Sequence, residues 1–278
     1  MRLQIVLFLA TFFTTLVAGA FLAGGNPIAR PHDLALGLMF AVPLLSILGV
    51  HEMGHYTAAR RNRVEVTPPY FIPAPPVGLS IGTFGAFIKI RSPLPHRDAL
   101  LEIGAAGPIA GALVAIPVLF LGMAMSEVRE VLPAAGGFQV RLGEPLLLKA
   151  ATYLLFGAIP EGQDVVLHPV AFAGWIGLFV TALNLIPSGQ LDGGHIAYAL
   201  FGGRYERVAR LVPVALLPLG LLWPGWLLWA GLLLVLGTRH PRPVFDEIPL
   251  SPGHRKIGAV AALLFLLCFT PAPFTVVG

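Results

Sequence analysis

Residues 45–61 read LSILGVHEMGHYTAARR, an apolar stretch that carries His51, Glu52 and His55 and ends in two arginines. Ionisable side chains are costly inside a membrane-spanning helix, and those that occur there usually face a cavity or a partner. Positions four apart lie on one face of an α-helix, so both imidazoles can bind one ion while Glu52 is displaced to the side. The pattern therefore predicts a metal site within this helix.

The composition places that helix in a membrane protein. Of the 278 residues, 56% are hydrophobic and only 12% are charged, whereas soluble domains carry about 25% charged residues. The single cysteine, Cys268, excludes a disulfide framework or a cysteine-based zinc site within one chain. A metal here must be held by His, Asp or Glu.

Hydropathy predicts an all-α polytopic membrane protein, a bundle of six or seven transmembrane helices. Its apolar segments lie near the ~20 residues that span a bilayer, at about 3–23, 34–59, 100–125, 168–187, 207–237 and 257–272. The first segment is expected to be a retained anchor, with a cleaved signal peptide as the alternative. Pro224 and Gly225 indicate either a kink in one long helix or the turn of a hairpin, which leaves the number open by one.

The charges indicate orientation rather than a nucleic-acid partner. The net charge is +4, and basic residues in membrane proteins mark cytoplasmic loops. Loop 60–98 is mostly basic and loop 126–167 mostly acidic, so we expect the HEMGH motif to lie nearer the cytoplasmic side. Neither loop reaches the ~50 residues of an independent domain, so residues 1–278 are expected to form one membrane-embedded domain.

A third metal ligand is expected from residues 181–200, TALNLIPSGQLDGGHIAYAL. Catalytic zinc takes three protein ligands and keeps one position open. Pro187 and the glycines after Asp192 can break a helix inside the protein, where non-helical backbone is tolerated if it lines a cavity. Asp192 could then reach the metal, although Asp-Gly-Gly is also ordinary turn chemistry.

HEMGH followed by NLIPSGQLDGGH resembles the site-2 proteases, intramembrane zinc metalloproteases that cut transmembrane helices of other proteins. The resemblance covers about residues 34–237, extends to GTFGAFIKIRSPLP (82–95) and EIGAAGPIAG (102–111), and is strongest for members without a PDZ domain. It implies one zinc per chain, with His51, His55 and Asp192 as ligands and Glu52 as catalytic acid/base. It also implies Asn184 as a polar group near the reacting carbonyl, for which capping of broken backbone is the alternative.

Residues 80–90, SIGTFGAFIKI, have glycines and an alternation that predict a strand pair or a bent strand. The alternative is a loop at the membrane surface. The resemblance implies a small re-entrant β element that adds the substrate as an extra strand. The residues expected to bind substrate there are Gly82, Thr83, Phe84, Gly85, Ala86 and Phe87. The preceding TPPYFIPAPP (67–76) is rich in proline and is expected to be an extended connector.

The remaining candidate residues have plainer interpretations. The glycines of EIGAAGPIAG form a small-residue face that lets helices pack closely. Three tryptophans are expected at the membrane interface or in packing: Trp223, Trp226 and Trp229. His195 has no role in the family scheme and is expected to support the site or to pack. The other histidines are expected on the solvated surface: His32, His96, His168, His240 and His254.

The expected function is hydrolysis of peptide bonds within or near transmembrane segments, with a transmembrane protein as substrate and the lipid bilayer as surroundings. Another class of membrane protease also carries H-E-x-x-H but needs a downstream Glu ligand, and the predicted downstream membrane segments offer none. A non-enzymatic metal-binding or transport protein is the second alternative, although it would have no need for Glu52. The sequence does not indicate the oligomeric state.

Overall fold

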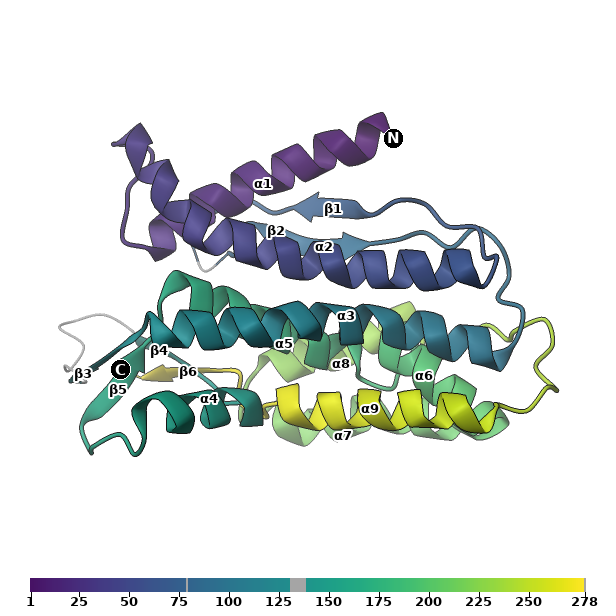
Figure 1. Cartoon of the computed structure of the whole chain (residues 1–278). Helices are drawn as coiled ribbons and strands as arrows, with labels where there is room; N and C mark the ends of the chain where they lie inside the picture. The colour runs from purple at the N-terminus through teal and green to yellow at the C-terminus, as the bar shows by residue number, and fades with distance from the viewer. Residues whose placement is uncertain (79, 131–138, 278) are drawn as a thin grey trace.

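Long apolar helices build most of the computed structural model, which describes residues 1–78, 80–130 and 139–277 (Figure 1). The α-helices are α1 (Arg2–Leu22), α2 (Leu38–Arg61), α3 (Arg97–Ala124), α4 (Leu146–Phe156), α5 (Pro169–Asn184), α6 (Asp192–Phe201), α7 (Tyr205–Leu219), α8 (Gly225–Leu236) and α9 (Pro252–Cys268). Short 3-10 helices, η1 (Pro31–Gly37) and η2 (Gly202–Arg204), precede α2 and α7. The mainly helical prediction is confirmed.

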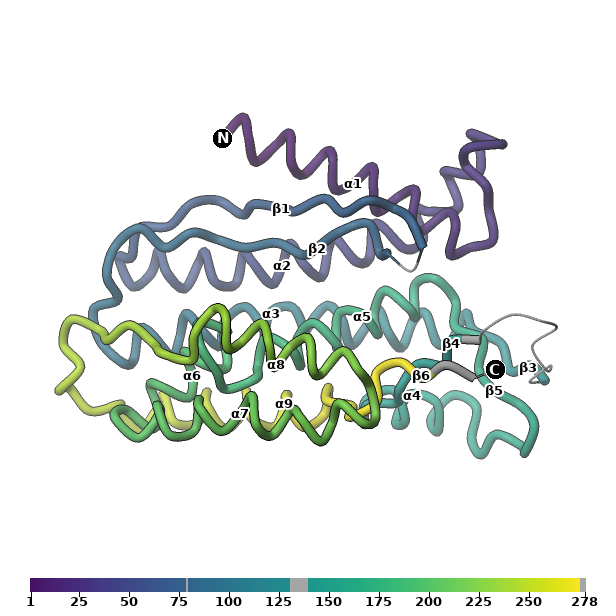
Figure 2. The backbone as a smooth tube through the Cα atoms, turned by 180° about the vertical axis from the view of Figure 1, so that it is seen from behind, coloured from purple at the N-terminus to yellow at the C-terminus, as the bar shows by residue number. Residues whose placement is uncertain are grey.

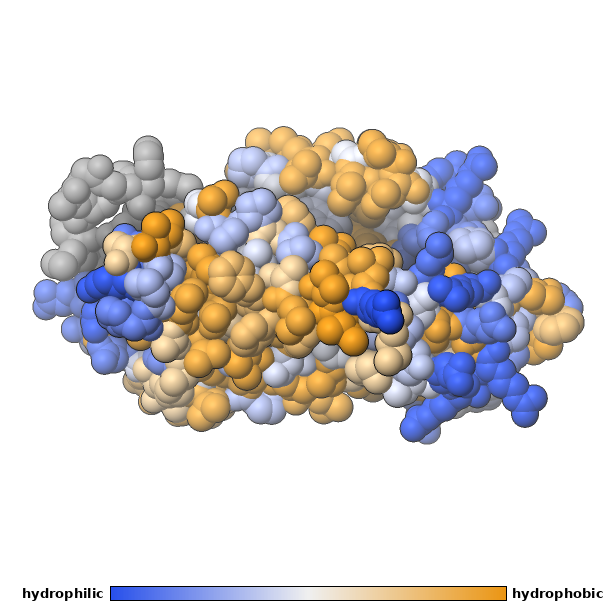
Figure 3. Space-filling model, turned by 90° about the horizontal axis from the view of Figure 1, so that it is seen from above, coloured by the Kyte–Doolittle hydropathy of each residue, from blue (hydrophilic) through white to orange (hydrophobic). Residues whose placement is uncertain are grey.

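The helices and the surface together describe an integral membrane protein. Three helical stretches in the described chain are long and apolar enough to cross a bilayer: Arg2–Leu22, Pro31–Arg61 and Arg97–Ala124. Figure 3 shows hydrophobic side chains over the middle of one face and hydrophilic ones gathered at its two ends. Three candidate crossings are thus evident, and the total of six or seven stays a prediction.

Helix α3 lies at the centre of the bundle and packs against α2, α5, α6 and α9. Small residues let its neighbours come close. A Cβ at Gly122 would lie 2.0 Å from the backbone nitrogen of Ala171, and one at Gly174 would lie 2.7 Å from the Cα of Leu119. The α3–α5 contact is therefore a backbone-to-backbone approach, and large side chains such as Trp175 fill the core beside it.

A two-stranded antiparallel ribbon lies between α1 and α2 (Figure 2). Strand β1 (Tyr70–Pro73) pairs with β2 (Thr83–Phe87), with Phe71 opposite Ala86. The strand prediction for residues 80–90 is confirmed. The connector prediction for 67–76 is wrong at β1, because the prolines flank or end the strand and leave Tyr70, Phe71 and Ile72 free to pair.

The structure corrects the loop expected at residues 126–167 and decides between the kinked helix and the hairpin expected at 207–237. Residues 126–167 hold α4 and three strands rather than a plain loop: β3 (Glu127–Glu130) pairs with β5 (Gln163–Val166), and β4 (Gln139–Leu142) pairs with β6 (Phe274–Val277). Part of that segment, 131–138, lies outside the described residues. Residues 207–237 form a hairpin, in which residues 220–224 separate α7 from α8.

The close α3–α5 approach predicts a strong effect of one methyl group. We expect Gly122→Ala to lower stability by about 1–3 kcal/mol, because the added carbon meets backbone that cannot rotate away. Thermal unfolding in detergent would measure this loss. Gly231→Ala is the matched control, since nothing lies within 4 Å of its added Cβ, and it should leave the unfolding temperature unchanged or slightly raised. Equal behaviour of the two variants would contradict the packing assignment.

Candidate metal centre

Two elements bring the predicted ligands together. Helix α2 carries His51 and His55 one turn apart, and α6 begins with Asp192. The two Nε2 atoms lie 3.2 Å apart. The Asp192 carboxylate reaches both imidazoles, with Oδ2 3.3 Å from Nε2 of His51 and Oδ1 3.3 Å from Nε2 of His55. These three residues form a group that could hold a metal ion.

The spacing of these donor atoms fits zinc. Ligands about 2.0–2.1 Å from one ion at tetrahedral angles lie about 3.3 Å from each other, close to the separations observed here. The second nitrogen of His55 supports the same assignment, because Nδ1 donates to the carbonyl of Ile103 at 2.7 Å. That bond holds the proton on Nδ1 and leaves the Nε2 lone pair for a metal.

A break between α5 and α6 delivers Asp192. The chain leaves the helical conformation after Asn184, and Gly189 adopts φ +59°. Its backbone is sheltered by protein, since Tyr205 donates its hydroxyl to the carbonyl of Gly189 at 3.0 Å. Gly193 is needed because a Cβ there would lie 2.1 Å from the carbonyl oxygen of Leu185. The predicted helix break at the Pro and Gly residues is thus confirmed.

The glycine face of α3 lies directly against the imidazoles. A Cβ at Gly107 would lie 2.0 Å from Nε2 of His55, and one at Gly111 would lie 3.1 Å from the His51 side chain. The close packing expected of these glycines is confirmed. Their partners, however, are the metal-site side chains, which no local pattern indicates.

One cavity of about 210 Å³ joins the metal group to the ribbon. Buried Glu52 lines it, and so does Asn184, whose Nδ2 lies 3.4 Å from Nε2 of His51. Of the residues expected to bind substrate, Ala86 and Phe87 line this cavity. The other four, Gly82, Thr83, Phe84 and Gly85, belong to the ribbon or its approach but are not among the described lining residues.

Comparison with known proteins agrees with this geometry, since residues 39–220 match the model of peptidase family M50. The chain belongs to this family, the site-2 proteases. "Probable zinc metalloprotease EGY2, chloroplastic" of Oryza sativa subsp. indica is 32% identical over 95% of the chain and 48% of its own length. The Arabidopsis thaliana proteins of the same description, EGY2 and EGY1, are 31% and 32% identical over 87% and 86% of the chain, and 43% of their own lengths.

The chain spans about half the length of these curated relatives. No solved structure matches it.

One histidine of this M50 chain lies where the sequence did not predict it. His240 is buried, and its Nε2 lies 2.5 Å from Nδ1 of His195, which lines the metal cavity. Because Nδ1 of His240 donates to the carbonyl of Pro241, its Nε2 accepts a hydrogen bond from His195. Burial also lowers the pKa of His240. The surface prediction is therefore wrong for His240, which is buried against His195.

The remaining histidines divide between caps, a polar network and the surface. His96 and His168 accept hydrogen bonds from the first turns of α3 and α5. His254 lies between two carboxylates of α3, and only His32 of the five predicted surface histidines has a largely exposed side chain. Trp226, expected at the interface or in packing, is buried and donates to the carbonyl of Pro271 at 2.7 Å.

The segment that carries His240 also ties α3 to α6. Asp246 accepts hydrogen bonds from Nε of Arg97 and from the hydroxyl of Tyr198, both at 2.9 Å. Burial raises the pKa of Asp246, but these two hydrogen bonds and the charges of the nearby arginines together hold the pKa below its usual value. Asp246 therefore stays ionised and fixes the end of the helix that begins with Asp192.

The contrast between two α3 glycines predicts a graded loss of metal. Gly107→Ala should weaken zinc binding roughly 10–100-fold, as displaced supports of metal ligands commonly do, because the new methyl group occupies the position of the His55 nitrogen. Gly111→Ala, on the same helix, needs a shift of only a few tenths of an ångström and should retain zinc. Metal content of the purified variants measures this. Full zinc in Gly107→Ala would contradict the observed approach of α3.

Proposed function

We propose that this chain is an intramembrane zinc metallopeptidase that hydrolyses peptide bonds within or near transmembrane segments of other proteins. The observation that carries the proposal is the cavity in which the buried Glu52 lies beside three residues with zinc spacing. The relatives, which are named as probable zinc metalloproteases, agree with it. The proposal extends to residues 1–278 as one membrane-embedded domain, with a family core at about 34–237.

The proposed roles follow from donor chemistry. His51, His55 and Asp192 would hold one zinc ion, which when bound activates water and polarises a carbonyl group. Glu52 takes a proton from the attacking water and returns it to the leaving amide nitrogen, since its carboxylate faces the same cavity and is not needed as a ligand. Asn184 donates its amide hydrogen to the carbonyl oxygen as negative charge develops there.

The ribbon is proposed to hold the substrate. Peptide bonds in a membrane helix are closed off by internal hydrogen bonds, so the segment to be cut must be extended first. Within the described residues, β2 pairs on one edge only, with β1, and its Ala86 and Phe87 line the metal cavity. An extended substrate that pairs with the other edge of β2 would bring its main chain to Glu52. The main-chain hydrogen bonds of this pairing depend little on the side chains of the substrate.

The basic loop at residues 60–98 supports a site nearer the cytoplasmic side. A non-enzymatic metal-binding protein is the less favoured alternative. Burying the ionisable side chain of Glu52 in a membrane helix costs free energy, and a protein that only binds metal through the other three residues would not need it.

The role assigned to Glu52 predicts that its substitution lowers cleavage without loss of zinc. Glu52→Gln should keep one zinc per chain and lower cleavage of a single-pass substrate by roughly 10²–10⁴-fold, because an amide cannot take the proton. His51→Ala, His55→Ala and Asp192→Ala should lose both zinc and cleavage. Glu206→Gln, which neutralises an exposed acid of α7, is the control and should do neither. An active Glu52→Gln protein would reject the mechanism, and full zinc in Asp192→Ala would reject the third ligand.

Main-chain capture by β2 predicts sensitivity to proline and tolerance of side-chain loss. Phe87→Pro and Gly85→Pro should slow cleavage of membrane substrates about tenfold or more, since each lost hydrogen bond removes about 0.5–1.5 kcal/mol, and Gly85 has φ +101°, which proline cannot adopt. Zinc content should stay unchanged. Phe84→Ala, which trims an exposed side chain of the same strand, should cut normally. Unimpaired cleavage by both proline variants would reject main-chain capture of the substrate by β2.

A further inference from the structure

A second cavity, of about 290 Å³, lies between α6 and α9 and is separate from the metal centre. Its lining is apolar, with residues from the α5–α6 break, α6 and α9 that include Pro187, Gly193, Phe201, Gly258, Ala262 and Leu266. Several of these side chains, including Phe201 and Leu266, are exposed. In a membrane protein, a groove of this kind opens towards lipid tails rather than water. We call it the α6–α9 groove.

Three cations flank one end of the α6–α9 groove in the sequence. Arg204 follows the groove residue Phe201 by three positions, and Arg255 and Lys256 lie three and two positions before the groove residue Gly258. All three cationic side chains are exposed. The arginine–carboxylate ion pairs found among the described residues use other arginines, namely Arg30, Arg97, Arg129 and Arg141. The three cations at the groove are thus left without a carboxylate partner in the described chain.

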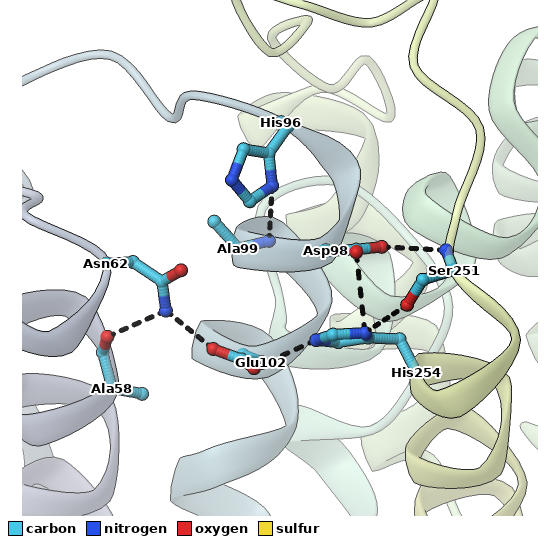
Figure 4. A network of polar contacts seen from close by, with 8 residues as sticks. All are labelled: Ala58, Asn62, His96, Asp98, Ala99, Glu102, Ser251 and His254. Atoms are coloured by element: carbon cyan, nitrogen blue, oxygen red, sulfur yellow. Dashed lines mark hydrogen bonds and ion pairs between the residues drawn. The ribbon is translucent and has the colours of Figure 1, made fainter.

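The nearby acids have other partners (Figure 4). His254, next to Arg255, lies with Nε2 2.8 Å from Glu102 and Nδ1 3.5 Å from Asp98. Asp98 also accepts from the backbone nitrogen of Ser251 at 2.9 Å, and Glu102 accepts from the side-chain amide of Asn62 at 2.6 Å. This network holds the start of α9 on α3 and directs these carboxylates to His254 and its neighbours instead of the flanking cations.

The chemistry of the groove favours a phospholipid. Its apolar lining suits an acyl chain, which needs no polar partner along its length. At the basic end, a phosphate is the group that several cations close to a membrane surface attract.

We propose that the α6–α9 groove binds one acyl chain of an anionic phospholipid, whose phosphate is held by Arg204, Arg255 and Lys256. Gly193, the residue after Asp192, forms part of the groove wall. A bound chain therefore packs against the helix break and stabilises the position of α6.

Lipid retention and thermal unfolding of the purified full chain test this proposal without any assay of cleavage. Native mass spectrometry should show one retained phosphatidylglycerol, and this lipid should raise the unfolding temperature more than phosphatidylcholine of the same chains. Arg255→Ala/Lys256→Ala should weaken retention roughly 30-fold, the loss expected for two cations near an anionic headgroup. Arg60→Ala/Arg61→Ala, which removes two exposed cations at the end of α2, is the control and should retain the lipid.

The apolar part is tested separately. Ala262→Trp fills the groove and should abolish the phosphatidylglycerol effect, whereas Leu263→Trp on the neighbouring exposed position should not. If Ala262→Trp fails to fold, the surface double variant still decides the outcome. Equal effects of the two lipids, unchanged retention in Arg255→Ala/Lys256→Ala, or the same stabilisation by soluble glycerol phosphate would overturn the proposal. Displacement of the lipid by a transmembrane substrate peptide would assign the groove to a substrate helix instead.

Discussion

The metal centre depends on how closely α3 approaches α2. The absence of side chains at Gly107 and Gly111 lets the α3 backbone lie against the two imidazoles. This approach places the carbonyl of Ile103 where it accepts from His55, and so sets which nitrogen faces the metal position. The same contact excludes lipid from the imidazoles. A small-residue face, common as a packing device in membranes, here also orients metal ligands.

A second constraint explains why so much of the chain surrounds the site. Non-helical backbone within a membrane must be sheltered by protein because lipid offers no hydrogen bonds. The break before Asp192 is covered by Tyr205 of α7. The ribbon is covered by α1, from which Thr14 donates to the carbonyl of Gly82 at 2.6 Å. Helices α1 and α7 carry no predicted metal ligand, but they shelter the non-helical backbone that places Asp192 and β2 beside the imidazoles.

Polar contacts outside the metal cavity also hold α3, α6 and α9 together. Asp246 joins Arg97 of α3 to Tyr198 of α6, and His254 joins α9 to α3. His240 reaches His195 in the cavity wall. Asp246 and His240 thus position α6, whose first residue completes the metal group, while the contacts of His254 occupy the nearby carboxylates and leave the flanking cations free for the lipid phosphate proposed above.

The sequence by itself determined the features that depend on spacing along one chain segment. The four-residue interval of His51 and His55, the apolar lengths, and the Pro and Gly residues before and after Asp192 act locally, so the histidine pair and the helix break were predictable, and the family resemblance added Asp192. Only the tertiary structure decided the rest. The burial of His240, the pairing of β1, the small sheets of 126–167 and the imidazole partners of Gly107 depend on residues far apart in sequence. A histidine or glycine has the same local pattern whether water, lipid or another helix covers it, and packing alone settles which.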